Sequence, residues 1–184
     1  MASASRDTIA LLGLRCSGKT TVGRLLAREL VLPFVDLDEE TLRAGRYAGW
    51  HVGSVGELLE RAGRAVFRDL EAGALRRALE PSPRLVLATG GGVVERADNR
   101  VWLRRVARCV YLEVPLDVLA RRLASDPAPR PALLGEDPVA ELAALLARRE
   151  PHYRALAESV VECGDAPAEE IARRIHAALE AHAA

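Results

Sequence analysis

The segment GLRCSGKT, Gly13 to Thr20, has the residue types and spacing that bind the phosphate groups of a nucleotide. It fits the pattern G-x-x-x-x-G-K-[ST], in which glycines let backbone N–H groups turn toward phosphate oxygens. An apolar run precedes the segment and an amphipathic helical pattern follows it, as this motif requires. The start of that helix would add the positive end of its dipole. We therefore predict a phosphate loop in which Lys19 reaches the β- and γ-phosphates and Thr20 offers its hydroxyl to Mg²⁺.

Lys19 is the only lysine of the chain, because the 26 basic residues are one lysine and 25 arginines. A compact ammonium on a flexible stem can follow a moving phosphoryl group, whereas the planar fork of arginine is too wide for a closed loop. A single lysine placed at random among the basic positions would fall here roughly once in 26 times. The composition therefore supports the motif over the alternative of a glycine-rich turn with an incidental lysine.

Two carboxylates, Asp36 and Asp38, end the apolar run PFVDLD, which we predict to be the second strand. Ligands of open α/β sheets gather at the carboxyl ends of strands, and strand alternation would direct both side chains toward one site. One carboxylate can hold Mg²⁺ through water, and the other can orient a substrate hydroxyl or accept its proton. The alternative is an acidic helix cap at Asp38. A shared site requires the ends of the first two strands to lie side by side.

Short apolar runs alternate with longer segments of helical period, which is typical of a parallel sheet covered by helices. We predict an α/β fold with three layers, α/β/α, and a five-stranded parallel sheet. Together with the phosphate loop, this is the P-loop NTPase fold of the nucleoside monophosphate kinase-like type. The predicted strands are 8–14, 33–38, 84–89, 108–114 and 159–163. The predicted helices are 20–30, 57–80, 95–106, 115–124, 138–157 and 166–184, with a further helix after DLDEE.

Length, composition and charge favour one domain over residues 1–184. The 26 basic residues balance 26 acidic ones, so nothing favours nucleic acid or a membrane surface as partner. No apolar run approaches the ~20 residues of a bilayer span, and no signal peptide is recognisable, so we expect a cytoplasmic protein. The three cysteines show no metal-like spacing. We expect a monomer, from the small size and the lack of an apolar seam.

Several further segments are similar to the shikimate kinases, a family that uses ATP and Mg²⁺ to phosphorylate the 3-hydroxyl of shikimate. The resemblance runs from Thr8 to about Ile175 and is carried by GLRCSGKTTVGR, VDLD, GELLERAGRAVFRDLE, ATGGGVV, RPALL and REPHY. It implies a substrate-binding subdomain at about 37–70 and a lid at about 125–138. It also implies ATP and shikimate as the small-molecule substrates and Mg²⁺ as the cofactor.

The resemblance assigns a role to each matching residue. The nucleotide site would comprise Gly13, Cys16, Ser17, Gly18, Lys19, Thr20, Thr21, Arg122 near the adenine, and Arg130 on the phosphates from the closing lid. The substrate site would comprise Asp38 at the reacting hydroxyls, Arg68 and Arg149 on the carboxylate, and the backbone of Gly90, Gly91 and Gly92. Thr20 and Asp36 would hold the metal, Glu71 would support Arg68, and Lys19, Asp38 and Arg130 would be catalytic.

Two departures from the family pattern bear on these expectations. Cys16 stands where the family usually has glycine, so the loop backbone there must tolerate a side chain. The stretch Arg46 to Gly53 is an insertion in the region expected to cap shikimate. Its Tyr47, Trp50 and His51 either pack locally or touch the substrate or a partner chain. The predicted function is thus ATP-dependent phosphorylation of shikimate. The alternatives are a kinase for another polyol acid such as gluconate, and a ligand sensor without turnover.

Overall fold

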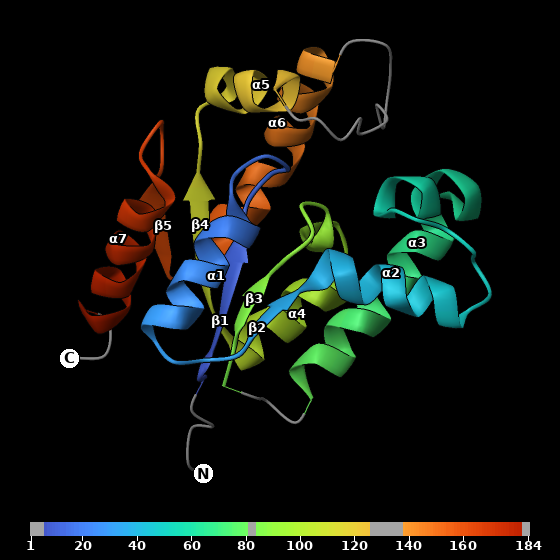
Figure 1. Cartoon of the computed structure of the whole chain (residues 1–184), viewed down its shortest axis with the longest axis horizontal. Coiled ribbons are helices and arrows are strands. Elements are labelled where there is room, and N and C mark those ends of the chain that lie inside the picture. The colour runs from blue at the N-terminus through green and yellow to red at the C-terminus, as the bar shows by residue number, and fades with distance from the viewer. Residues whose placement is uncertain (1–5, 81–83, 126–137, 182–184) are drawn as a thin grey trace.

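The computed structural model describes residues 6–80, 84–125 and 138–181. Its sheet has five parallel strands in the order β2-β3-β1-β4-β5 (Figure 1). The strands are β1 (Thr8–Leu12), β2 (Phe34–Asp36), β3 (Val86–Ala88), β4 (Ala107–Glu113) and β5 (Ser159–Glu162). The helices are α1 (Lys19–Glu29), α2 (Leu37–Tyr47), α3 (Val55–Leu79), α4 (Ala97–Val106), α5 (Leu116–Ala124), α6 (Pro138–Leu156) and α7 (Ala168–Ala181), with a 3₁₀ turn η1 (Val93–Glu95).

Helices cover both faces of the sheet, which confirms the predicted three-layer α/β/α architecture. All five residues of β1 are buried, and they alternate between two cores. Ile9 and Leu11 pack with α1 and α7 on one face. Ala10 and Leu12 pack with the C-terminal part of α3, with α4 and with the end of α6 on the other. Burial on both faces explains why the central strands β1, β3 and β4 are continuous apolar runs.

A third, smaller core lies beside the sheet, between α2 and the start of α3 (Figure 1). Val52, Leu58 and Phe67 are its buried members, and Trp50 packs against them. Trp50 of the Arg46 to Gly53 insertion therefore packs locally, whereas the Tyr47 side chain is 88% exposed. At the start of α3, Ser54 accepts a hydrogen bond from Glu57 N, and Glu57 accepts one from Gly53 N, as in a capping box.

The second strand ends earlier than predicted. β2 stops at Asp36 and α2 begins at Leu37, so Asp38 belongs to a helix and the expected strand alternation of the two carboxylates is wrong. The predicted acidic cap is present, but Asp36 provides it: its Oδ1 accepts a hydrogen bond from Asp38 N at 3.0 Å. An aspartate whose side chain satisfies the first free N–H groups favours a helix start over a longer strand.

The first two strands are not neighbours, which corrects a further expectation. β3 lies between them, with Ala88 aligned with Leu11 on one side and with Asp36 on the other. The segments that follow β1 and β2 still meet, because α1 begins shortly after β1 and packs over β3 toward β2. Thr20 in the first turn of α1 is thereby brought to Asp36.

Two predicted helices have different boundaries in the structure. α3 contains a break at Gly63, where φ is 79°, so the continuous helix predicted for 57–80 is two helical pieces. The helix predicted for 95–106 begins as η1 and continues as α4 after Arg96. Within the described ranges, no helix combines the length and apolar character needed to cross a membrane.

Candidate active site

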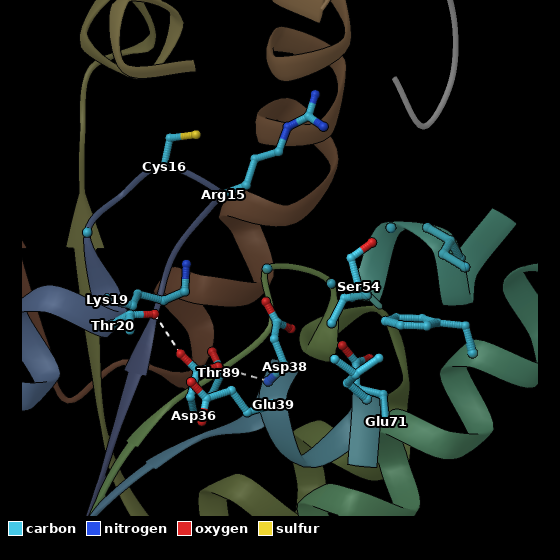
Figure 2. A pocket seen from close by; sticks show the side chains of 18 of the residues that line it. Arg15, Cys16, Lys19, Thr20, Asp36, Asp38, Glu39, Ser54, Glu71 and Thr89 are labelled. Atoms are coloured by element: carbon cyan, nitrogen blue, oxygen red, sulfur yellow. Dashed lines mark hydrogen bonds between the residues drawn. The ribbon is translucent and has the colours of Figure 1, made fainter. Parts of the chain in front are cut away.

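A cavity of about 750 Å³ opens at the carboxyl ends of the central strands, between the sheet and the α2–α3 core (Figure 2). Its floor and walls come from the loop after β1, the end of β2, the starts of α2 and α3, and the loop after β3. The polar residues that line it are Arg15, Cys16, Lys19, Thr20, Thr21, Asp36, Asp38, Glu39, Ser54, Arg68, Glu71, Thr89, Arg122 and Arg149. Both cations and carboxylates therefore face one space.

The loop before α1 surrounds the Lys19 ammonium closely. Lys19 is 9% exposed, and its Nζ donates to Leu14 O at 2.7 Å and to Ser17 Oγ at 3.2 Å. Gly18 caps α1 with a φ of 90°, a conformation that suits glycine. Cys16 also has a left-handed φ of 64°, which explains why glycine is the usual residue there. Cys16 thus keeps the left-handed backbone conformation of the loop, although this conformation is unfavourable for a residue with a side chain.

The hydroxyl of Thr20 and the carboxylate of Asp36 are in direct contact. Thr20 Oγ1 donates to Asp36 Oδ2 at 2.7 Å, while the other oxygen of Asp36 caps α2 (Figure 2). Asp38 follows in the first turn of α2 and also lines the cavity. A hydroxyl and a carboxylate are hard oxygen donors of the kind that Mg²⁺ takes together with several waters. The donor set therefore fits a magnesium ion.

Arg68 is held by two carboxylates and by the loop after β3. Its Nη1 donates to Glu71 Oε2 at 2.8 Å, and its Nη2 lies 3.2 Å from Glu95 Oε2. Burial raises the pKa of Glu71, and the positive charge of Arg68 opposes that rise. A Cβ atom on Gly92 would come within 1.9 Å of Arg68 Nη2, so only glycine leaves room for the guanidinium.

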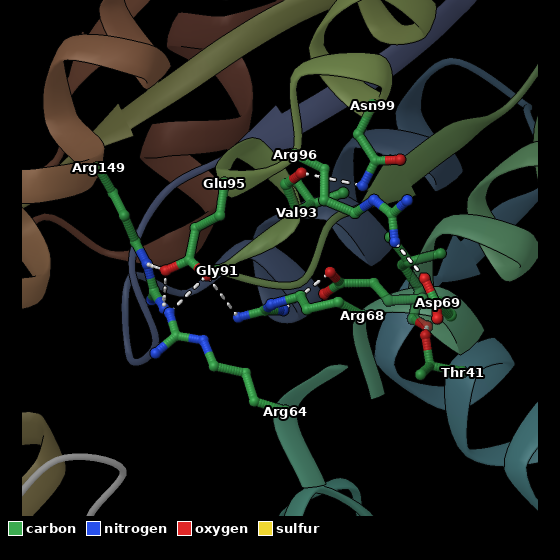
Figure 3. A network of polar contacts seen from close by, with 12 residues as sticks. Thr41, Arg64, Arg68, Asp69, Gly91, Val93, Glu95, Arg96, Asn99 and Arg149 are labelled. Carbon is green, nitrogen blue, oxygen red and sulfur yellow. Dashed lines mark hydrogen bonds and ion pairs between the residues drawn. The ribbon is translucent and has the colours of Figure 1, made fainter. Parts of the chain in front are cut away.

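Arg149 reaches the cavity from α6. Its side chain is only 4% exposed, and its Nε and Nη2 lie 2.9 Å and 2.8 Å from Glu95 Oε1 (Figure 3). Glu95, in η1, therefore contacts both Arg68 and Arg149. Two buried guanidinium groups with donors left over can bind a ligand carboxylate with charge-assisted hydrogen bonds.

The loop after β3, which holds Gly90, Gly91 and Gly92, packs against α6. Tyr153, which is fully buried, donates its hydroxyl to Gly91 O and stacks on Tyr111 with ring centroids 5.1 Å apart. A Cβ atom on Gly90 would come within 2.7 Å of both Asp38 Oδ1 and Glu71 Oε1. The absence of side chains at Gly90 and Gly92 thus lets these two carboxylates and Arg68 converge.

The family model for shikimate kinase matches residues 15–180, which is most of the chain. The chain belongs to the shikimate kinase family. It is 46% identical over 158 residues to the shikimate kinase of Oleidesulfovibrio alaskensis, covering 85% of this chain and 88% of that one. It is 38% identical to shikimate kinase 2 of Yersinia enterocolitica, with 92% and 94% covered.

A solved structure of a shikimate kinase from Acinetobacter baumannii in complex with shikimate is also similar. It matches with a TM-score of 0.84 and 34% identity, over 95% of this chain and 93% of that chain. The shared fold extends over nearly the whole length, so the fold expected of the family is confirmed.

Most residues that the family resemblance singled out line the one cavity. They are Cys16, Gly18, Lys19, Thr20, Thr21, Asp36, Asp38, Arg68, Gly91, Gly92, Arg122 and Arg149. Within the described ranges, Gly13, Ser17 and Gly90 do not line it directly, and Arg130, with nearly all of the predicted lid, lies outside the described residues. Arg122 donates to Cys16 O at 3.3 Å and to Gly164 O at 2.9 Å, so it also braces the phosphate loop.

Two groups of residues at this cavity could not be predicted from the sequence. An apolar wall formed by Leu42, Val55, Leu59 and Phe67 faces the carboxylates. Its residues look like ordinary helical core positions, so no signal in one sequence identifies them. Glu95 was also missed, although it follows the glycine triplet by three residues and is therefore carried to the site by the same loop.

Proposed function

We propose that this protein transfers the γ-phosphoryl group of ATP to the 3-hydroxyl of shikimate, giving shikimate 3-phosphate and ADP. The bond between the γ-phosphorus and the bridging β–γ oxygen breaks as the bond from the hydroxyl oxygen to that phosphorus forms. The hydroxyl proton leaves to Asp38 or to water, and the bridging oxygen departs on ADP.

One observation carries this proposal: the phosphate loop and the Arg68–Arg149 pair open into the same cavity. The loop suits a triphosphate, and the arginine pair suits a small carboxylic acid. Asp38 lines the cavity between them and can meet a hydroxyl of that acid (Figure 2). When the acid is held at its carboxylate and at its hydroxyls, one hydroxyl oxygen is oriented toward the γ-phosphate of ATP. Because both reactants are then fixed on the protein, the transfer proceeds like an intramolecular reaction.

In this mechanism the protein contributes mainly positioning and positive charge. Lys19 neutralises charge on the transferring phosphoryl group, and we propose that Arg130 does the same from the lid. The transition state of phosphoryl transfer is loose, so Asp38 orients the hydroxyl and needs to be only a weak base. The apolar wall excludes water, which would otherwise hydrolyse ATP.

We propose Mg²⁺ as the cofactor, held by the Thr20 hydroxyl and, through water, by Asp36. Their contact at 2.7 Å and their oxygen donors support this assignment. When bound, the ion would neutralise charge on the β- and γ-phosphates. The hydrogen bond from Thr20 to Asp36 keeps both oxygens at the mouth of the phosphate loop before any nucleotide arrives.

The proposal also includes a monomeric, single-domain enzyme of the cytoplasm with a substrate-binding subdomain and a lid. The separate small core between α2 and α3 supports a substrate-binding subdomain at about 37–70. A lid at about 125–138 would bring Arg130 to the phosphates. The large exposed apolar side chains of the described residues are scattered over different elements, including Val31, Tyr47, Val101 and Val160, which supports a monomer. Sedimentation equilibrium would test the oligomeric state.

A coupled assay for ADP release, run with ATP and Mg²⁺, tests the function. Shikimate should support turnover, whereas gluconate should support none above the background hydrolysis of ATP. Turnover with gluconate alone would favour the polyol-acid alternative. Binding of shikimate without ADP release would favour the sensing alternative.

A further inference from the structure

Glu95 is the centre of a cluster of four arginines, which we call the Glu95 cluster. Figure 3 shows three of them, Arg64, Arg68 and Arg149. Its Oε1 lies 2.8 Å from Arg149 Nη2 and 2.6 Å from Arg148 Nη2. Its Oε2 lies 2.8 Å from Arg64 Nη2 and 3.2 Å from Arg68 Nη2. Arg64 and Arg68 belong to α3, whereas Arg148 and Arg149 belong to α6. One carboxylate therefore joins two helices that the chain separates by about 80 residues.

Glu95 touches these arginines from outside the cavity. Arg68 and Arg149 line the cavity, but Glu95 is not among the described residues that line it. The Arg68 Nε atom is buried and, within the described ranges, has no hydrogen-bond partner. The Glu95 carboxylate contacts Nε and Nη2 of Arg149 but only Nη2 of Arg68. Each guanidinium has five N–H donors, so neither is used up by Glu95.

The cluster keeps a surplus of positive charge. Burial alone would raise the pKa of Glu95, but the hydrogen bond from Arg64 and the charges of Arg149 and Arg68 outweigh it and lower that pKa to about 2. Glu95 is therefore an anion at every pH at which the enzyme works. Even with Glu71 counted as a second anion, four guanidinium groups face two carboxylates, so the cluster has a positive charge that favours an anionic substrate.

We propose that Glu95 is a positioning residue that fixes the spacing and orientation of Arg68 and Arg149, so that both meet the substrate carboxylate at once. This inference rests on the proposed function, because the carboxylate in question is that of shikimate. Arg149 is almost fully buried, and without Glu95 its guanidinium would lack the acceptor that holds it on the cavity wall. Bidentate recognition depends on such an orientation being fixed in advance.

The sign of the effect separates positioning from simple electrostatics. Removing a negative charge beside an anion site should by itself strengthen the binding of an anion. Loss of positioning should weaken it. We therefore expect Glu95→Gln to raise the KM for shikimate about tenfold, equivalent to about 1.4 kcal/mol, while kcat and the KM for ATP change less than about threefold. Glu95→Asp, which keeps the charge on a shorter stem, should fall between the wild type and Glu95→Gln.

Shikimate methyl ester provides the decisive comparison, because it keeps the reacting hydroxyls and lacks the carboxylate charge. For the ester, kcat/KM should be the same in the wild type and in Glu95→Gln within about twofold. Asp98→Asn is the matched control: Asp98 lies three residues on and pairs with Arg96, outside the Glu95 cluster. This variant should leave all constants unchanged. Thermal unfolding of each variant would verify that it folds, and Glu95→Asp keeps the test available if Glu95→Gln does not.

Unchanged or tighter binding of shikimate by Glu95→Gln would overturn the inference, as would equal losses for the acid and the ester. Calorimetric binding of shikimate separates this failure from failure of the proposed function. Turnover by the wild type with no effect at Glu95 would leave the function and remove the inference. Binding of shikimate that depends on Glu95 but gives no turnover would keep the inference and overturn the proposed function. A wild type that neither binds nor phosphorylates shikimate would overturn both the function and the inference.

Discussion

Replacing Gly92 by alanine tests whether Arg68 is part of the substrate site. The backbone φ of Gly92 is −100°, which any residue can adopt, so the added methyl group brings no backbone strain. The new Cβ would lie 1.9 Å from Arg68 Nη2, 2.4 Å from its Cζ and 2.6 Å from its Nη1. The guanidinium must therefore move, while the main chain can stay where it is.

The size of the effect follows from that displacement. Arg68 Nη2 must retreat by about 1.5 Å to reach an ordinary van der Waals distance from the methyl group. A misplacement of about 1 Å in a substrate-positioning group can lower activity by about 100-fold. We therefore expect kcat/KM for shikimate to fall by about 100-fold. The free energy of unfolding should drop by only about 1 kcal/mol, because the displaced atoms end a flexible side chain.

The assay is steady-state ADP release at varied shikimate and at varied ATP, with urea unfolding measured in parallel. Gly73→Ala in α3 is the matched control, since its Cβ would meet Arg77 Nη1 at an acceptable 3.4 Å. That variant should keep full activity and gain up to about 1 kcal/mol of stability, because alanine favours a helix interior over glycine. The KM for ATP should stay unchanged in both variants.

A Gly92→Ala enzyme that binds shikimate as the wild type does would refute the role given to Arg68. So would a loss of stability large enough to account for the loss of activity. In either case the clash would be relieved somewhere other than at the substrate.

Three further predictions follow from the same site. Asp38→Asn should lower kcat by about 100-fold or more while the Kd for ATP, measured by calorimetry, stays within about twofold; unchanged turnover would contradict the role of Asp38. Tyr153→Phe leaves Gly91 O without its donor, so urea unfolding should show a loss of about 1–2 kcal/mol, together with a higher KM for shikimate. Since the pKa of Glu95 is lowered from 4.5 to about 2, its stabilisation, up to about 3 kcal/mol, is complete above pH 4.5 and lost as pH falls toward 2. The stability difference between the wild type and Glu95→Gln should therefore shrink between pH 5 and pH 3.5, and a constant difference would contradict this linkage.

The layers of the fold could be predicted from the sequence because local patterns determine them. Continuous apolar runs such as Thr8 to Leu12 are buried on both faces, and the intervening segments have the helical period that covers such strands. The phosphate loop was predictable for the same reason, since Gly13 to Thr20 contains the whole motif within eight residues. The layers and the phosphate loop were predictable because each is written in a pattern of neighbouring residues that fits only one structure.

Strand order and the start of α2 could not be obtained in this way. Nothing local indicates that β3 inserts between β1 and β2, because that choice depends on which helix packs over which strand. At Asp36, the strand pattern and the capping pattern overlap, and the apolar residue between the two carboxylates fits both. Leu37 is fully buried, which suits the first turn of α2 packed on the sheet as well as a strand.

The arginines are the hardest part of this chain to interpret from sequence, and the structure gives a physical reason. Among the described residues, many arginines, such as Arg24, Arg61 and Arg121, pair with carboxylates at the surface, where such a pair contributes little. Arg68 and Arg149 differ because, like Arg15, they are largely buried, and a buried guanidinium requires a nearby anion. Glu71 and Glu95 supply those anions from positions 3 and 54 residues away from their partners. It is therefore the carboxylates, brought together only by the fold, that decide which arginines remain available to a substrate.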